Sequence, residues 1–167
     1  MDFGLAGLRL GIIYSFNEEV VKALTPLGTY KCVPHIIQHA AATIVNDKAW
    51  CDEFYLPTVK EKLRNAYERG YDRLTSMGIK VRRATAGCFL WFNLQPYLKR
   101  QTEEEEMELQ NELLDAGLYI VPGTKLYCNS PGWFRIVFSV SPKELEVGLD
   151  RLEIVLKARK ERNMRDN

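Results

Sequence analysis

The sequence predicts an α+β fold in which helices cover one face of a small sheet, preceded by a segment of α/β type without a complete sheet. Its 167 residues, 46% of them hydrophobic, suffice for one domain or for one domain and part of another. From Thr58 onward the signals run helix, strand, strand, helix, strand, strand, helix, the order of a helix-covered sheet. Before it only one strand is indicated, and a lone buried strand needs partners. We therefore expect residues 1–57 to be the tail of a larger domain and residues 58–167 to be a domain of their own.

The first part contains one apolar run and several helix signals. Leu8–Tyr14 is mostly apolar and ends in isoleucines, which is typical of a buried strand. Asn17 is a good N-cap, and the two glutamates after it favour the first turn of a helix. Pro34 suits the first turn of a second helix. We expect helices from Asn17 to about Pro26 or Gly28, over 35–45, and briefly near 47–54.

The second part opens with a capping box. Thr58 and Glu61 have the spacing at which each side chain satisfies the backbone N–H of the other, so they predict the start of the longest helix. Gly78 predicts the end of this helix. Residues that favour extended structure then predict strands over 79–83 and 88–94.

A second capping box and two more strands follow. Thr102 and Glu105 predict a helix that ends at Gly117, with the acidic run 103–106 as its first turn. Strands are expected over 118–121 and 133–140.

The clearest start signal opens the terminal helix. Ser141, Pro142 and Glu144 combine a cap, a proline in the first turn and a glutamate at the third position. The apolar residues of this helix share one face: Leu145, Leu149, Leu152 and Leu156. The basic run 157–165 is interpreted as a solvated, frayed helix end.

Composition excludes several classes of function. A net charge of +1 offers no attraction to nucleic acid or to an acidic membrane surface, and no apolar run reaches the roughly 18–20 residues of a membrane span. Four scattered cysteines without a paired motif indicate a reducing compartment, so we expect a cytoplasmic protein. His35 and His39 are four residues apart on a presumed helix but have no obvious third ligand, so no metal site is expected.

Several blocks, in order along nearly the whole chain, carry a family likeness. Residues 2–11 match the motif Asp-Phe/Met-Gly-x-x-Gly-x-Arg-x-Gly that follows the Schiff-base lysine of class I/II, fold type I, pyridoxal-phosphate enzymes. Residues 86–92 and the two Pro-Gly blocks at 122–123 and 131–138 are similar to blocks of the plant 1-aminocyclopropane-1-carboxylate (ACC) synthases and the animal ACC synthase-like proteins. The chain thus resembles the pyridoxal-phosphate-dependent aminotransferase superfamily, and within it the ACC synthases most of all.

The resemblance implies a fold, a cofactor and two site residues. The fold is the C-terminal part of a fold type I transferase, with 1–57 as a remnant of the large cofactor-binding domain and 58–167 as the small domain. The cofactor is pyridoxal 5'-phosphate, and its phosphate-binding arginine corresponds to Arg9. The arginine that binds the substrate α-carboxylate corresponds to Arg135. The Schiff-base lysine falls where this chain has Met1, so no catalytic residue is assigned.

Taken by themselves, the two arginines also have ordinary interpretations. Arg9 among glycines offers a fork of donors suited to phosphate, but it equally fits an ion-pairing residue beside a strand. Arg135 lies between Phe134 and Ile136, and the two-residue period of a strand could direct it simply to solvent. Family position favours ligand contact for both.

The function expected of the intact family members differs from the function expected of this chain alone. The resemblance implies the C-terminal portion of an aminotransferase or ACC synthase-like enzyme, a transaminase or a carbon–sulfur lyase, which takes an amino-acid substrate and forms a homodimer when intact. We expect this chain to be inactive alone, because a methionine at position 1 forms no Schiff base. The alternative is a non-catalytic α+β module that dimerises, or binds a partner chain or a small carboxylate through Arg135.

Overall fold

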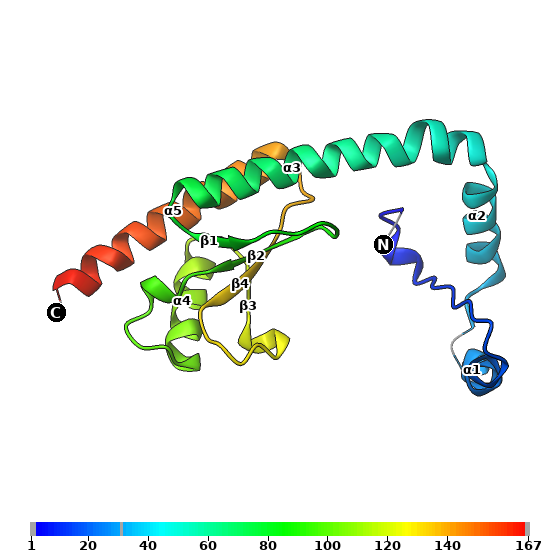
Figure 1. Ribbon diagram of the computed structural model, residues 1–167, viewed down its shortest axis with the longest axis horizontal. Helices are drawn as coiled ribbons and strands as arrows, with labels where there is room; N and C mark the ends of the chain where they lie inside the picture. Colours follow the sequence, from blue (N-terminus) through cyan, green and yellow to red (C-terminus); the bar gives the residue numbers. More distant parts are fainter. Residues whose placement is uncertain (1–2, 31, 166–167) are drawn as a thin grey trace. The chain divides into compact units, whose positions relative to one another are not determined.

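The computed structural model describes residues 3–30 and 32–165 (Figure 1). By its internal contacts the chain divides into two compact units, of which the first ends at Thr58 and the second begins at Val59. The boundary falls near the start of a long helix, α3, which spans Leu56–Ser76.

The first unit is helical in the part of it that the structure describes. A 3-10 turn over Ala6–Leu8 is followed by irregular chain, and then come α1 (Glu18–Tyr30), α2 (His35–Asn46) and a π-helical stretch (Trp50–Tyr55). The predicted buried strand over Leu8–Tyr14 is therefore wrong, and the side chains of Ile12 and Ile13 are 83% and 73% exposed. An apolar run forms a strand only where a neighbouring strand satisfies its N–H and C=O groups, and the described part of this unit supplies none.

The helix signals of the first unit are confirmed, with one shifted end. Asn17 Oδ1 accepts a hydrogen bond from the N–H of Glu19 at 3.0 Å, so it caps α1 as predicted. The helix continues past the predicted end, through Pro26 to Tyr30, because a proline removes one donor without preventing the turns that follow. The helix over 35–45 is confirmed, but Pro34 is its N-cap, with a non-helical ψ of 142°, and not a residue of its first turn.

The start of α3 differs from the one that the capping box predicts. The π-helical stretch runs directly into it, and the N–H of Leu56 donates to the carbonyl of Cys51. Thr58 therefore lies inside the helix and is not its N-cap. Nor is α3 the longest helix, since it has 21 residues against 24 in α5 (Pro142–Arg165).

A four-stranded antiparallel sheet in the order β1-β2-β4-β3 forms the second unit together with its helices. The strands are β1 (Lys80–Arg82), β2 (Phe89–Asn93), β3 (Val121–Pro122) and β4 (Trp133–Val137). Each overlaps a predicted strand, although β3 has only two residues and β4 ends three residues before the predicted end.

Along β2 and β4, the two central strands, buried side chains that face the core alternate with more exposed side chains on the opposite face of the sheet. Leu90, Phe92, Phe134 and Ile136 are buried, and they share one core with apolar residues of α3, α4 (Glu103–Asp115) and α5. Figure 1 shows α3 and α5 lying across one side of the sheet. The predicted α+β fold with a small helix-covered sheet is confirmed.

Capping interactions define the ends of the second unit's helices. Thr102 Oγ1 accepts from the N–H of Glu105 at 3.4 Å, the first half of the predicted box. Ser141 and Glu144 form a complete box, with the Glu144 N–H donating to Ser141 Oγ at 3.3 Å and the Ser141 N–H donating to Glu144 Oε2 at 3.0 Å. Gly78 follows α3 with a φ of 77°, as its predicted end requires.

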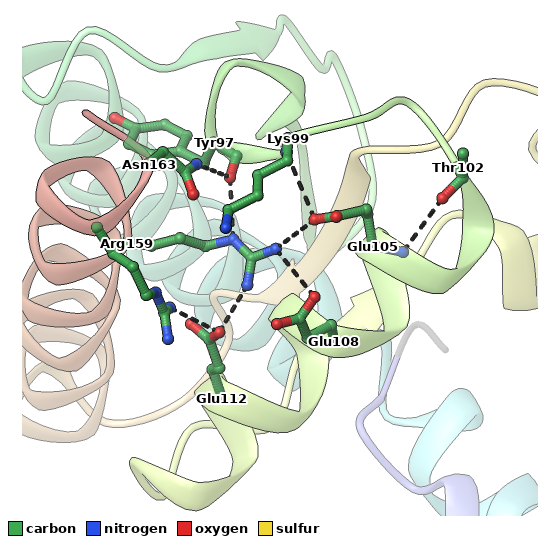
Figure 2. A network of polar contacts seen from close by, with 9 residues as sticks. Tyr97, Lys99, Thr102, Glu105, Glu108, Glu112, Arg159 and Asn163 are labelled. Atoms are coloured by element: carbon green, nitrogen blue, oxygen red, sulfur yellow. Dashed lines mark hydrogen bonds and ion pairs between the residues drawn. The ribbon is translucent and has the colours of Figure 1, made fainter. Parts of the chain in front are cut away.

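A buried ion-pair network joins α4 to the end of α5 (Figure 2). The Arg159 guanidinium donates to the carboxylates of Glu105 at 2.7 Å and Glu112 at 2.6 Å, and its Nε donates to the carbonyl of Tyr97 at 2.9 Å. Arg159 is only 2% exposed, so it departs from the predicted solvated helix end, whereas the other basic residues of the run 157–165 are exposed as predicted. The helix continues to Arg165, so this end is not frayed within the described residues. The acidic run of α4 is likewise more than a first turn, because two of its four glutamates are buried.

Candidate functional site

Arg135 lies at the centre of β4, between two strands that pair with it. Its register partners are Trp91 on β2 and Val121 on β3. Its neighbours Phe134 and Ile136 belong to the core, so the two-residue period directs Arg135 to the opposite face of the sheet. We call this the open face, and its residues are Lys80, Arg82, Phe89, Trp91, Asn93, Val121, Trp133, Arg135 and Val137.

The guanidinium of Arg135 forms no ion pair within the described chain. Its Cζ lies 4.4 Å from the centroid of the Phe89 ring, a cation–π contact. Its Nε is buried and has no acceptor among the described residues. A buried donor without a partner costs about 1–3 kcal/mol, so the hydrogen-bonding capacity of this guanidinium is not satisfied by the described chain. A carboxylate suits the group because a guanidinium donates two parallel hydrogen bonds to it.

Positive charges and aromatic rings dominate the open face. Lys80 and Arg82 lie on it with Arg135, and none of the open-face residues is acidic. The rings of Trp91 and Trp133 stack with centroids 5.7 Å apart and an interplanar angle of 9°. Such a surface favours an anionic ligand with flat or apolar parts.

Two glycines allow the loops at one end of the open face to pack closely. Gly132 has a φ of 95°, and a Cβ built on it would lie 2.5 Å from Gln95 Cγ and 2.9 Å from the backbone of that residue. At Gly123 an added Cβ would lie 2.9 Å from the carbonyl oxygen of Trp133 and 3.2 Å from the Trp91 ring. The glycines of both Pro-Gly pairs of the sequence motif are therefore required by local packing.

A buried carboxylate connects the two ends of the loop between β3 and β4. Glu106 of α4 is 0% exposed, and it accepts hydrogen bonds from the N–H and hydroxyl of Thr124, at 3.0 and 2.7 Å, and from the N–H of Gly132. No cation pairs with it in the described part of the chain. The sequence interpretation missed this residue. Its spacing from Leu109 and Leu113, which places all three on one helix face, is the signal that could have found it.

Arg9 belongs to the first unit and follows its 3-10 turn. Its side chain is exposed, its φ is 52°, and its N–H donates to the carbonyl of Ala6 at 3.2 Å. The left-handed conformation costs about 1–2 kcal/mol for a residue with a Cβ, and such strain clusters at functional sites. Arg9 and Arg135 lie in different units, so each offers a separate candidate contact. Met1, the predicted Schiff-base position, lies outside the described residues.

The other candidate residues are not gathered into a site. His35 and His39 are exposed on α2, and the described residues contain no group of three His, Cys, Asp or Glu side chains that could hold a metal. Burial, reinforced by Asp52, raises the pKa of the Cys51 thiol, which favours the unreactive protonated form. No helix in the described ranges is long and apolar enough to span a membrane.

Sequence comparison finds ACC synthases and proteins similar to them. The chain is 36% identical to mouse 1-aminocyclopropane-1-carboxylate synthase-like protein 1 over 155 residues, which are 93% of this chain and 31% of that protein. It is 36% identical to 1-aminocyclopropane-1-carboxylate synthase 11 of Arabidopsis thaliana over 154 residues, 91% of this chain and 33% of that protein. It is 34% identical over 155 residues to mouse "Probable inactive 1-aminocyclopropane-1-carboxylate synthase-like protein 2", covering 93% of this chain and 27% of that protein. The chain therefore spans about a third of the length of these curated relatives.

Solved aminotransferases share the fold. An aromatic aminotransferase from Pyrococcus horikoshii matches with a TM-score of 0.81 at 21% identity, covering 95% of this chain and 41% of that one. An aspartate aminotransferase from Thermus thermophilus, solved with maleate, matches with a TM-score of 0.78 at 22% identity, covering 92% of this chain and 38% of that one. The fold is thus that of a portion of these proteins, and it corresponds to the C-terminal part that the sequence resemblance implied.

The family comparison agrees with both the fold and the relatives. The family described as aminotransferase class I and II matches residues 2–152, a range that includes Arg9, the whole sheet and Arg135. The chain belongs to the aminotransferase class I and II family.

Proposed function

We propose that this chain is the C-terminal portion of a pyridoxal-phosphate-dependent aminotransferase or ACC synthase-like protein, and that Arg135 binds the α-carboxylate of an amino-acid substrate. The observation that carries the proposal is the state of Arg135: a half-buried guanidinium whose Nε has no acceptor in the described chain, on a face without acidic residues. The names of the relatives, which include ACC synthases and aminotransferases, support an amino acid as the substrate class.

The surroundings of Arg135 suit a carboxylate in orientation as well as in charge. Phe89 holds the guanidinium against its ring, which limits the directions in which the free donors point. Two parallel N–H···O bonds from a guanidinium fix the plane of the carboxylate they hold. An amino acid held in this way has a defined α-bond to be broken.

For the cofactor, the described residues supply one fitting contact. Arg9 is exposed and forms no ion pair with a described residue. It follows the 3-10 turn Ala6–Leu8, and Gly4 before that turn also has a positive φ, so Arg9 can approach a phosphate dianion. Bound pyridoxal phosphate supplies an electron sink for the α-carbon of the amino acid. Because Met1 stands where the resemblance places the lysine, we propose that this chain alone forms no covalent bond to the cofactor at that position and is inactive by itself.

Two further parts of the proposal concern assembly and compartment. Large exposed apolar side chains in the first unit, among them Ile12, Ile13 and Phe16, favour association, so a homodimer is proposed for the intact protein. The free thiols of Cys51, Cys88 and Cys128 support a reducing, cytoplasmic location.

A second candidate function is a non-catalytic binding module. It is favoured by one observation: the hydrophobic core of the described chain consists entirely of residues from the second unit, which also carries Arg135. In this case Arg135 binds a carboxylate without subsequent chemistry.

Calorimetric titration of the full chain with maleate tests the carboxylate site. We expect Arg135→Gln to weaken binding about tenfold or more, because a charge-assisted pair is lost. The matched control is Arg82→Gln, which removes the same charge from the same face and is expected to change affinity by less than about fivefold. Equal losses in the two variants would show a nonspecific effect of charge and overturn the assignment.

Cofactor attachment is tested separately. The chain is incubated with pyridoxal phosphate, reduced with borohydride and analysed by peptide mass spectrometry. We expect only low, scattered labelling of surface lysines. Stoichiometric labelling of a single lysine would show that another side chain supplies the amine that Met1 lacks, and would remove the ground for the proposed inactivity.

A further inference from the structure

We propose that Glu106 is a positioning residue for the open face: it holds the start of β4 in the register that presents Arg135 to a ligand. The carboxylate lies on α4, is fully buried and contacts the loop that leads into β4, so it does not itself face the ligand. The effect on ligand binding rests on the proposed carboxylate site. The effect on the position of β4 rests only on the contacts of Glu106.

Glu106 joins the two ends of the loop that connects β3 to β4. It accepts two hydrogen bonds from Thr124, just after β3, and one from the N–H of Gly132, just before β4. The same segments are also joined through their backbones, since the N–H of Gly123 donates to the carbonyl of Trp133 at 2.6 Å. The Gly132 carbonyl in turn accepts from the N–H of Leu94 at 2.6 Å. Glu106 is thus the side-chain acceptor at the point where β2, β3 and β4 meet.

The register of β4 decides whether Arg135 faces a ligand or the core. A slip of one residue moves every side chain of a strand to the other face of the sheet. β4 has only five residues and β3 only two, so few ladder hydrogen bonds oppose such a slip. A residue that is held in place immediately before β4 therefore has a large influence on the register of this strand. Gly132 is such a residue, three positions before Arg135.

The chemistry of Glu106 differs from that of the neighbouring glutamate. Glu105 pairs with the Arg159 guanidinium and thereby ties α4 to α5, whereas Glu106 has only uncharged donors around it. A buried carboxylate without a cation is costly unless several donors satisfy it. Its three donors all belong to the two ends of the loop between β3 and β4, so what Glu106 stabilises is the mutual position of those two ends.

The test uses the full chain and three readouts. Glu106→Gln keeps the size of the side chain but replaces one acceptor oxygen with an NH₂ group, which faces donors. Its matched control is Glu103→Gln, an exposed position on the same helix with the same loss of charge. The readouts are the upfield ring-current shifts of the stacked Trp91 and Trp133 rings by NMR, the maleate dissociation constant, and the urea midpoint. A Trp133→Phe variant assigns the ring signals.

A positioning role predicts changes within the folded state. We expect folded Glu106→Gln to lose much of the ring-current shift and to bind maleate about tenfold or more weakly, while Glu103→Gln matches the wild type. A merely structural role would lower the urea midpoint and leave both folded-state readouts unchanged, and that result would overturn the proposal.

Two further measurements decide the role of Glu106 if the variant does not fold or the wild type binds no maleate. If Glu106→Gln does not fold, Thr124→Val removes only the hydroxyl donor to Glu106, and it is expected to shift the tryptophan signals in the same direction; unchanged signals in that variant would overturn the proposal. If the wild-type chain binds no maleate, the carboxylate site fails, but the ring-current readout still decides the role of Glu106.

Discussion

The two units of the chain use their apolar residues in opposite ways. In the second unit they form one continuous core, whereas in the described part of the first unit Cys51 is the only buried apolar residue. Phe16 and Tyr30 of the first unit are 91% and 87% exposed. Helices form in both units because caps and turn-to-turn hydrogen bonds are local. The difference teaches that secondary structure needs only local signals, while a core needs a second layer to pack against.

Core truncation gives the largest expected difference between the units. Phe134 is fully buried in the second unit, so Phe134→Ala should lower the free energy of unfolding by about 3–5 kcal/mol. Ile13 is 73% exposed in the first unit, and Ile13→Ala should change the free energy of unfolding by less than about 0.5 kcal/mol. Urea unfolding followed by circular dichroism measures both. Similar losses would mean that the first unit has a core of its own.

Next in size is the buried ion-pair network of the second unit. Arg159→Met leaves the buried Glu105 without its cation, although the N–H of Lys99 still donates to it, and should cost about 3–5 kcal/mol of unfolding free energy. Arg162→Met is the control: this arginine binds the same Glu112 but is half exposed, so about 1 kcal/mol or less is expected. If urea midpoints of the two variants coincide, the network is no more than a surface cluster.

Substitutions of glycine compare how closely the backbone is packed in the two units. Gly132→Ala places a methyl group within 2.9 Å of the Gln95 backbone at a φ of 95°, which should cost about 1–3 kcal/mol. Gly11→Ala in the first unit meets nothing within 4 Å and should stay within about 0.5 kcal/mol. Thermal unfolding of both variants against the wild type is the measurement. A neutral Gly132→Ala would contradict the close loop packing described for the open face.

The smallest expected effect is a dependence of helix capping on pH. Hydrogen bonds from the Ser141 side chain and backbone lower the pKa of Glu144 below its ordinary value of 4.5. A folded-state pKa that is depressed contributes stability above the unfolded value, and this contribution is lost as the pH falls through the folded value. Urea midpoints between neutral and acidic pH should therefore fall less steeply in Glu144→Gln than in the wild type.

The corresponding cap of the first unit behaves differently. Asn17 caps α1 through an amide, which does not titrate, so Asn17→Ser should leave the slope of stability against pH unchanged. A changed slope in that variant, or an unchanged one in Glu144→Gln, would contradict the assignment of the acid dependence to the α5 cap.

The sequence by itself determined much of the fold, through interactions between residues that are close together in the chain. The box of Ser141 and Glu144 forms as predicted because its groups are three residues apart. The central strands follow from their residues in the same way, and the motif around Arg135 predicted that this arginine belongs to a site. Which side of the sheet it faces stayed open until the packing of Phe134 and Ile136 in the core decided it.

Only the tertiary structure decided the features that depend on distant partners. Leu8–Tyr14 forms no strand because nothing in the described part of its unit pairs with it, whatever its apolar content. Arg159 and Glu105 are 54 residues apart, and Glu106 and Gly132 are 26 residues apart, so sequence spacing reveals neither contact. The physical reason is common to all of these: a strand edge or a buried charge is stable only where remote segments supply its hydrogen-bond partners, and packing alone brings those segments together.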